Sequence, residues 1–154
     1  YTATDQDYIE GVYFPSTYLI PVDEAPIDTA KRLRAKFEEK FAPYSQEAAK
    51  QNIKWTTILK LASIIQREAA GKSDMPLISG ILWNRLDQNM KLGIDVTLQY
   101  IRGNEKIGWW PVLKITDKQI DSPYNTYKYY GLPPHPISNP GLEAIDAALN
   151  PQKT

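Results

Sequence analysis

A single carboxylate interrupts the apolar face of a predicted helix in the segment LKLASIIQREAAGK, residues 60–73. At about 100° per residue, Leu61 and Ile64 fall on one side, and Glu68 follows them by seven and four positions. Burial disfavours the charged form of a carboxyl, so we expect the pKa of Glu68 to be raised. A glutamic acid protonated at neutral pH suits general acid catalysis, such as protonation of a glycosidic oxygen. The alternative is a structural ion pair with an arginine of the core.

Two further charged residues are candidates for the same chemistry. Arg85 lies among apolar residues of the next predicted helix, where it could pair with Glu68, pair with Asp95 or hold a substrate oxygen. Asp95, in GIDVT, is favoured as the N-cap of a following helical turn. Its other interpretation is the second carboxylate of a glycosidase-like pair.

Aromatic and amide side chains form a second group of candidates. The sequence YNTY places Tyr124, Asn125 and Tyr127 in a proline-rich loop. Such groups suit sugar recognition, because rings stack on sugar faces and amides bond hydroxyls, but they suit loop anchoring equally well. Trp109 and Trp110 are either an exposed sugar platform or residues that fill the core.

Composition excludes several classes of site. The chain has no cysteine and one histidine, His135, so neither a thiolate metal site nor a Ser-His-Asp triad is supported. We therefore predict no metal and no cofactor, and the glycine-rich phosphate motifs of nucleotide-binding proteins are absent from the sequence. Eighteen basic residues balance eighteen acidic ones, which argues against nucleic acid as a partner.

The elements that must position these residues are mostly helices. The patterns predict helices at 25–41, 45–51, 55–70 and 75–89, with Gly71 capping the third, and a last helix at 141–149 capped by Asn139. Residues 9–21 read as extended, residues 92–103 as strand or short helix, residues 106–120 as an irregular excursion ending in a helical turn, and residues 122–141 as an ordered loop. We expect a mainly helical α+β domain with a small β element from 9–21, and a second candidate strand region at 92–115.

At 154 residues the chain is long enough for one domain with a core, so we expect residues 1–154 to form a single unit. No run approaches 18 apolar residues, and no signal peptide is visible. The chain opens at Tyr1 rather than at Met, which favours a processed or excised piece.

Five segments resemble, in order, the catalytic domain of the endolytic murein transglycosylase family, also called MltG or YceG-like. The likeness runs from about Ile9 to Pro151. The segments are EGVYFPSTY (10–18), LASIIQRE (61–68), ILWNRL (81–86), MKLGIDVTLQY (90–100) and PYNTYKYYGLPPHPISNPG (123–141).

The resemblance implies a bacterial enzyme that cleaves the β-1,4 bond between N-acetylmuramic acid and N-acetylglucosamine in peptidoglycan glycan strands. It leaves a 1,6-anhydro-muramyl end, and the family's catalytic Glu matches Glu68. One carboxyl group is enough for this reaction, and the resemblance implies a lysozyme-like placement of that Glu by analogy of mechanism. The motif positions that we assign to substrate binding are Asn84, Arg85, Asp95, Tyr124, Asn125 and Tyr127.

The chain departs from the family pattern at Ser16, Gln66, Gly93, Val96 and His135. Of these, Gly93 and Val96 flank Asp95, which puts the conformation and preference of this part of the cleft in question. Family members also carry an N-terminal membrane-spanning helix and a small LysM-like domain, neither of which is in this chain. We therefore expect a soluble fragment of a membrane-anchored enzyme that works outside the cytoplasm, near the penicillin-binding proteins that polymerise glycan.

Three rival functions remain. The first is a hydrolytic muramidase in which Asp95 activates water or stabilises the oxocarbenium ion, and the second is a non-catalytic peptidoglycan-binding module. The third is aminodeoxychorismate lyase, a label sometimes given to YceG-like proteins. That chemistry needs a pyridoxal phosphate lysine and a phosphate cup, and the sequence shows neither signature.

Overall fold

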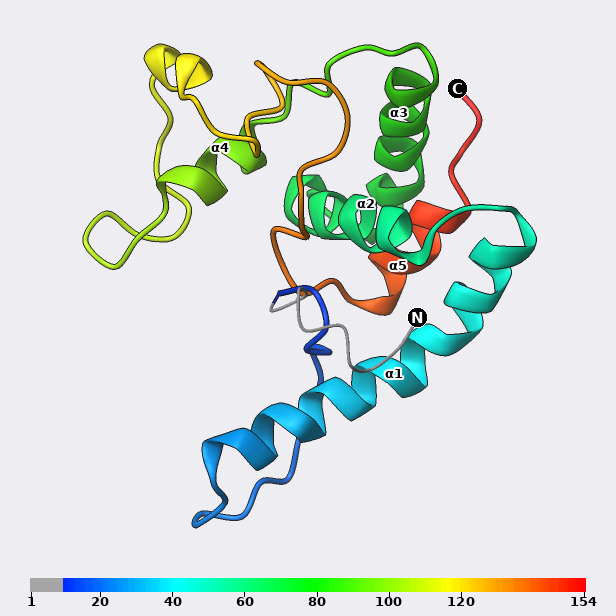
Figure 1. Ribbon diagram of the computed structural model, residues 1–154, viewed down its shortest axis with the longest axis vertical. Helices are drawn as coiled ribbons and strands as arrows, with labels where there is room; N and C mark the ends of the chain where they lie inside the picture. Colours follow the sequence, from blue (N-terminus) through cyan, green and yellow to red (C-terminus); the bar gives the residue numbers. More distant parts are fainter. Residues whose placement is uncertain (1–9) are drawn as a thin grey trace.

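The computed structural model describes residues 10–154, which fold into five α-helices and two short 3₁₀ helices (Figure 1). None of the described helices is both long and apolar enough to cross a lipid bilayer. The elements in chain order are α1 (Pro26–Lys50), α2 (Trp55–Glu68), η1 (Lys72–Asp74), α3 (Met75–Asp87), α4 (Asp95–Arg102), η2 (Ile115–Gln119) and α5 (Leu142–Leu149).

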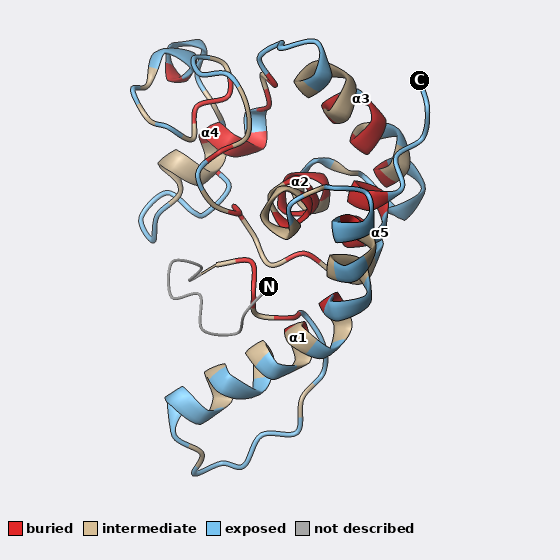
Figure 2. Ribbon diagram, turned by 45° about the vertical axis from the view of Figure 1, so that its right-hand side comes forward, coloured by how far each residue is buried: buried red, intermediate tan, exposed pale blue. Residues whose placement is uncertain are grey.

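Helix α2 is the centre of the core. It contacts α1, α3, α4 and α5, and its contact with α5 is the most extensive (Figures 1 and 2). The apolar stripe predicted from the sequence is buried completely: Ile58, Leu61, Ile64 and Ile65 are fully excluded from solvent. An amphipathic helix buried on most of its circumference gives the molecule a rigid centre, from which the last turn of α2 can present polar groups.

The first helix is longer than predicted. Two helices were expected at 25–41 and 45–51, but α1 runs unbroken from Pro26 to Lys50 with Pro43 inside it. Pro43 has no amide hydrogen for the carbonyl four residues earlier. Phe41 and Ala48 are both buried on the same face, so core contacts on either side of the proline keep the two halves in one helix.

The expected β element is not present among residues 10–154. Residues 10–21 contain no strand, and the only pairing outside helices is an isolated antiparallel bridge between Asn104 and Gly108; residue 9 lies outside the described residues. The stretch 92–103, left open between strand and helix, forms α4. The described part of the chain is therefore helical rather than α+β, because its extended segments lie on helices instead of pairing with each other.

The proline-rich segment 122–141 is an ordered loop, as predicted, and its last residues, 137–141, are hydrogen-bonded to α2. The Ile137 amide donates to Ser63 Oγ at 3.1 Å, the Ser138 hydroxyl donates to the Ser63 carbonyl at 2.9 Å, and the Gly141 amide donates to Gln66 Oε1 at 2.9 Å. Asn139, predicted as the N-cap of α5, instead accepts hydrogen bonds from the amides of Gly11 and Tyr13, and Gly141 holds the cap position.

Candidate active site

Glu68 is the last residue of α2, and this position determines whether its side chain is buried or exposed. The helix was expected to continue to residue 70 with Gly71 as its cap, but Ala69 is already extended, with φ −70° and ψ 134°. The core stripe stops before Glu68, which is exposed rather than buried, so the expectation of a buried carboxylate was wrong. Glu68 instead opens onto a cavity of about 250 Å³.

The pKa of Glu68 is nevertheless raised, as predicted. The first cause is desolvation by the cavity wall, and the second is the negative charge of Asp95. Although Glu68 as a whole residue is exposed, neighbouring atoms exclude part of the water around its carboxyl group. The protonated form of Glu68 is therefore favoured in this site, which is the form that a general acid needs.

Asp95 faces the same cavity and does not cap a helix. It is the first residue of α4, whose N-cap is Ile94, and no side-chain bond caps this end. The Tyr127 hydroxyl donates to Asp95 Oδ1 at 2.6 Å. Burial and this hydrogen bond raise the pKa of Tyr127 to about 12, so Tyr127 remains a donor at neutral pH.

Arg85 pairs with neither carboxylate. Its Nη1 donates to the carbonyl of Leu92, and no ion pair links Arg85 to Glu68 or Asp95 in the part of the chain that the structure describes. Of the three interpretations of Arg85, the two ion pairs are thus excluded. Its side chain lines the cavity together with the apolar residues that precede it in α3 (Ile78, Ile81 and Leu82).

Gly93, one of the departures from the family pattern, forms part of the same wall. Its φ of +59° lies in the left-handed region that favours glycine. A Cβ on Gly93 would lie 3.6 Å from both Tyr127 and Arg85, an ordinary contact distance. The backbone conformation, rather than lack of space, therefore favours glycine here.

A buried cluster of hydrogen bonds joins the YNTY loop to the start of α4. Thr126 Oγ1 accepts from the Ile94 amide at 2.9 Å and lies 2.9 Å from Thr97 Oγ1, while the Gly93 amide donates to the Thr126 carbonyl at 2.9 Å. Asp95 and Tyr127 each lie one residue beyond this cluster. Sequence reasoning did not identify Thr126 or Thr97, and no local pattern marks their contact, since they are 29 positions apart.

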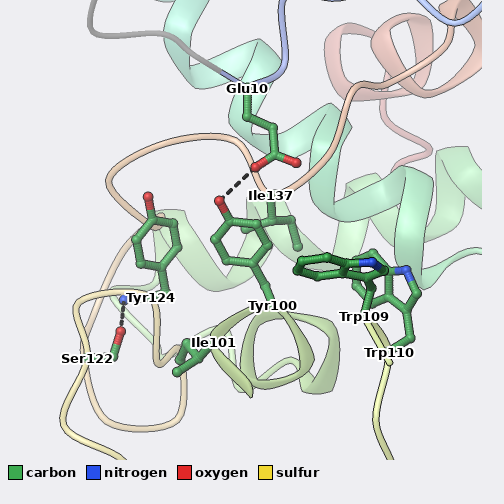
Figure 3. Close-up of a pocket in the computed structure, with 8 residues that line it drawn as sticks. All are labelled: Glu10, Tyr100, Ile101, Trp109, Trp110, Ser122, Tyr124 and Ile137. Atoms are coloured by element: carbon green, nitrogen blue, oxygen red, sulfur yellow. Dashed lines mark hydrogen bonds between the residues drawn. The ribbon is translucent and has the colours of Figure 1, made fainter. Parts of the chain in front are cut away.

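The structure places the other predicted substrate-binding residues elsewhere. Asn125 is fully buried: its Nδ2 donates to the carbonyls of Lys118 and Ile120, and its Oδ1 accepts from the Tyr127 amide. Asn125 therefore supports the loop from inside. Asn84 faces the C-terminal tail, where its Nδ2 donates to Thr154 Oγ1. Tyr124 lines a different, aromatic cavity (Figure 3).

Glu68, Asp95, Tyr127 and Arg85 thus converge on one cavity from four segments that are distant in sequence. Chemically, the site offers a desolvated carboxyl, a second carboxylate oriented by a phenol, and a guanidinium, which together suit acid–base chemistry on a polar substrate. Among residues 10–154, no group of three or more His, Cys, Asp or Glu side chains has the arrangement of a metal site.

Comparison with known proteins identifies relatives of the whole chain. The model of the YceG-like family matches residues 2–154. Two relatives named endolytic murein transglycosylase, from Bacillus subtilis (strain 168) and Streptococcus pneumoniae serotype 2 (strain D39 / NCTC 7466), are 36% and 32% identical over 95% of this chain. The chain spans only 40% and 27% of their respective lengths.

A solved structure shares the fold. The crystal structure of a yceG-like protein from Listeria monocytogenes superposes with a TM-score of 0.85 at 35% sequence identity. The match covers 94% of this chain and 46% of the Listeria chain. The helical arrangement described above is therefore common to both proteins.

Proposed function

This chain belongs to the YceG-like family, and on that premise we propose that it is the catalytic part of an endolytic peptidoglycan lytic transglycosylase. Its substrate would be the β-1,4 bond between N-acetylmuramic acid and N-acetylglucosamine within a glycan strand. The observation that carries the proposal is Glu68, whose desolvated carboxyl opens onto a cavity shared with Asp95.

The reaction that we propose uses Glu68 twice. Protonated Glu68 donates its proton to the glycosidic oxygen, and the bond from that oxygen to C1 of the muramyl residue breaks, releasing the glucosaminyl hydroxyl. The Glu68 carboxylate then accepts the proton of the muramyl C6 hydroxyl, whose oxygen bonds to C1 and closes the 1,6-anhydro ring. Glu68 ends in its starting protonation state, and water is not consumed.

Asp95, Tyr127 and Arg85 have supporting roles in this proposal. The charge of Asp95 favours the protonated form of Glu68 and can stabilise positive charge that develops at C1. Tyr127 holds the Asp95 carboxylate in one orientation through its 2.6 Å hydrogen bond. Arg85, which bonds a backbone carbonyl and has no carboxylate partner, keeps guanidinium donors for substrate oxygens.

Hydrolysis is the second candidate, and the position of Asp95 favours it. A second carboxylate in the cavity of the acid is the arrangement of ordinary glycosidases, in which it activates water or forms a covalent intermediate. The two functions differ in their product: hydrolysis leaves a reducing sugar end, whereas transglycosylation leaves an anhydro end.

The test is to incubate this chain and Glu68→Gln with purified peptidoglycan and to identify the released fragments by mass spectrometry. We expect anhydro-muramyl ends from the native chain and a loss of at least about 10²-fold in rate for Glu68→Gln. Glu39→Gln, an exposed glutamate on α1, is the matched control and should remain active. Reducing ends would establish hydrolysis instead, and no product from the native chain would favour a binding module.

The site of action in the cell follows from the substrate. Peptidoglycan lies outside the cytoplasmic membrane, so we propose that the full-length protein works there, held by an N-terminal anchor and close to penicillin-binding proteins. Cross-linking of the full-length protein in living cells tests this association, and recovery of cytoplasmic partners alone would contradict it.

A further inference from the structure

A second, larger cavity is lined by a different set of residues from the one that contains Glu68. Its volume is about 690 Å³, within the range of small-molecule sites. Figure 3 shows its lining, in which the rings of Tyr124, Tyr100 and the two tryptophans follow one another and the Glu10 carboxylate reaches in from the N-terminal segment. The mechanism at Glu68 does not use any of these groups.

Both tryptophans of this cavity are open to solvent, and Trp110 is also held in place by a neighbouring side chain. Trp109 is 61% exposed and Trp110 36% exposed, so neither fills the core. The guanidinium of Arg67 lies directly over the Trp110 ring, a contact that fixes the indole. The Tyr100 and Tyr124 rings pack 5.1 Å apart. Exposed aromatic side chains that are fixed by neighbours in this way mark a binding surface.

The polar groups of the cavity favour a ligand that donates hydrogen bonds and carries no negative charge. Glu10 Oε2 accepts from the Tyr100 hydroxyl at 2.7 Å, and the other carboxylate oxygen of Glu10 has lone pairs for a ligand hydroxyl or N–H. A phosphate or carboxylate ligand would be repelled by Glu10, so of the two sugars in a glycan strand the uncharged N-acetylglucosamine fits better than N-acetylmuramic acid with its lactyl carboxylate. A pyranose fits both features, because its C–H face packs on indole while its hydroxyls and acetamido N–H donate hydrogen bonds.

The same two helices, α2 and α4, contribute residues to the surroundings of both cavities. Arg67, which fixes Trp110, directly precedes Glu68 in α2. Helix α4 supplies Asp95 to one cavity and Tyr100 to the other, and five residues of helix separate these two positions by about 7.5 Å along the axis. At about 100° per residue these two positions lie on different sides of α4, so a glycan strand that occupied both cavities would pass across this helix.

We propose that the aromatic cavity is a saccharide subsite that binds a pyranose unit of the same glycan strand whose bond lies at Glu68. The proposal rests on the proposed function, since it takes the glycan strand as the substrate. Occupation of this subsite would hold the strand on both sides of α4, so strands long enough to reach it would be bound more tightly than short fragments.

Binding is measured first, without cleavage, in the Glu68→Gln background. The probe is peptide-free glycan of alternating N-acetylglucosamine and N-acetylmuramic acid, prepared with an amidase and separated by length. We expect long strands to shift the indole N–H resonances of Trp109 and Trp110 in NMR spectra, and Trp109→Ala to weaken their binding by about tenfold. Trp109→Phe should recover part of this loss, and Tyr130→Ala, at a position 63% exposed, should bind normally.

Activity is measured second, with Glu68 intact. Loss of a distal subsite removes binding that is equal in the ground and transition states, so Trp109→Ala should raise KM for long strands by about tenfold with kcat unchanged. Short fragments should show no difference between Trp109→Ala and the native chain.

The outcomes separate this proposal from the proposed function. Normal binding of long strands by Trp109→Ala, together with Glu68-dependent product, would contradict the proposed subsite and support the proposed enzymatic function. Trp109-dependent binding without any product would support the saccharide-binding site and contradict the proposed enzymatic function. Binding to Trp109→Ala that is weakened equally for all lengths would place the contact at the Glu68 cavity and contradict the subsite.

Discussion

Two carboxylates face one cavity here, and their surroundings differ. The wall of the cavity desolvates Glu68, whereas Asp95 accepts a hydrogen bond from Tyr127 at 2.6 Å. Desolvation and the negative charge of Asp95 both disfavour ionisation of Glu68, and so raise its pKa. Glu68 is therefore the carboxyl of this pair that suits general acid catalysis of glycosidic bond cleavage.

Asp95→Asn is expected to move the alkaline limb of the pH profile of kcat/KM to lower pH. Protonated Glu68 is the active form in the free enzyme, and the negative charge of Asp95 raises the pKa of Glu68. Without that charge Glu68 loses its proton at lower pH, so activity falls sooner as pH rises. Tyr127→Phe keeps the charge and should leave the limb near its native position. An unchanged limb in Asp95→Asn would show that Asp95 does not influence Glu68.

Glu68→Gln is expected to stabilise the fold at neutral pH while it removes activity. The folded-state pKa of Glu68 is raised, so folding favours the protonated acid, and this contribution is lost as pH rises through that pKa. The variant avoids this loss, so its Tm should exceed the native Tm at pH 7. The difference should disappear below about pH 4, where Glu is protonated in both states. Melting curves at several pH values test the sign, and a lower Tm at pH 7 would contradict it.

At the scale of elements, the site depends on contacts between the YNTY loop and the start of α4. Thr126 is the central residue, because it bonds the Ile94 amide and contacts Thr97 while both neighbours in the loop point elsewhere. Asn125 anchors the loop from inside, and Tyr127 reaches Asp95. The YNTY tetrapeptide thus contains both a residue that anchors the loop, Asn125, and a residue that orients the Asp95 carboxylate, Tyr127.

Thr126→Val is expected to reduce the free energy of unfolding by about 1–3 kcal/mol, because the buried Ile94 amide loses its acceptor. Valine keeps the shape of threonine, so the loss isolates the hydroxyl. Urea denaturation measures the change, and Thr126→Ser, which keeps the hydroxyl, is the control. Because α4 carries Asp95, we also expect kcat to fall for the fraction that remains folded. Equal stability of the valine and native proteins would rule out this role for the hydroxyl.

At the scale of the molecule, α2 serves both stability and catalysis. Its apolar stripe is fully buried, and the helix packs against α1, α3 and α5 (Figure 2). The helix ends at Glu68, which is exposed to solvent. A rigid central helix places an acid more accurately than a loop does.

Leu61→Ala is expected to cost about 2–5 kcal/mol of unfolding free energy, because the cavity left in a fully packed core cannot collapse. Leu77→Ala, on the exposed face of α3, is the matched control and should cost much less. Urea denaturation of both variants tests this difference. Since Leu61 lies two turns from Glu68, we expect the folded fraction of Leu61→Ala to keep measurable activity at low temperature.

The sequence alone determined the features that depend on local periodicity and on family motifs. The apolar stripe of α2, the helical turn near residue 115 and the ordered loop at 122–141 were predictable, because helix and turn signals act over a few residues. The YceG-like resemblance was likewise confirmed, because its motifs are short and occur in order.

Only the tertiary structure decided how distant residues meet. It showed that Glu68 is exposed at the end of its helix, that Arg85 bonds a carbonyl rather than a carboxylate, and that Asn125 is buried. Residues 10–21 formed no strand, and Arg67 came to lie over Trp110. Arg67 and Trp110 are 43 positions apart, and even the nearer contacts of Arg85 and Asn125 form only when the surrounding segments pack into one core.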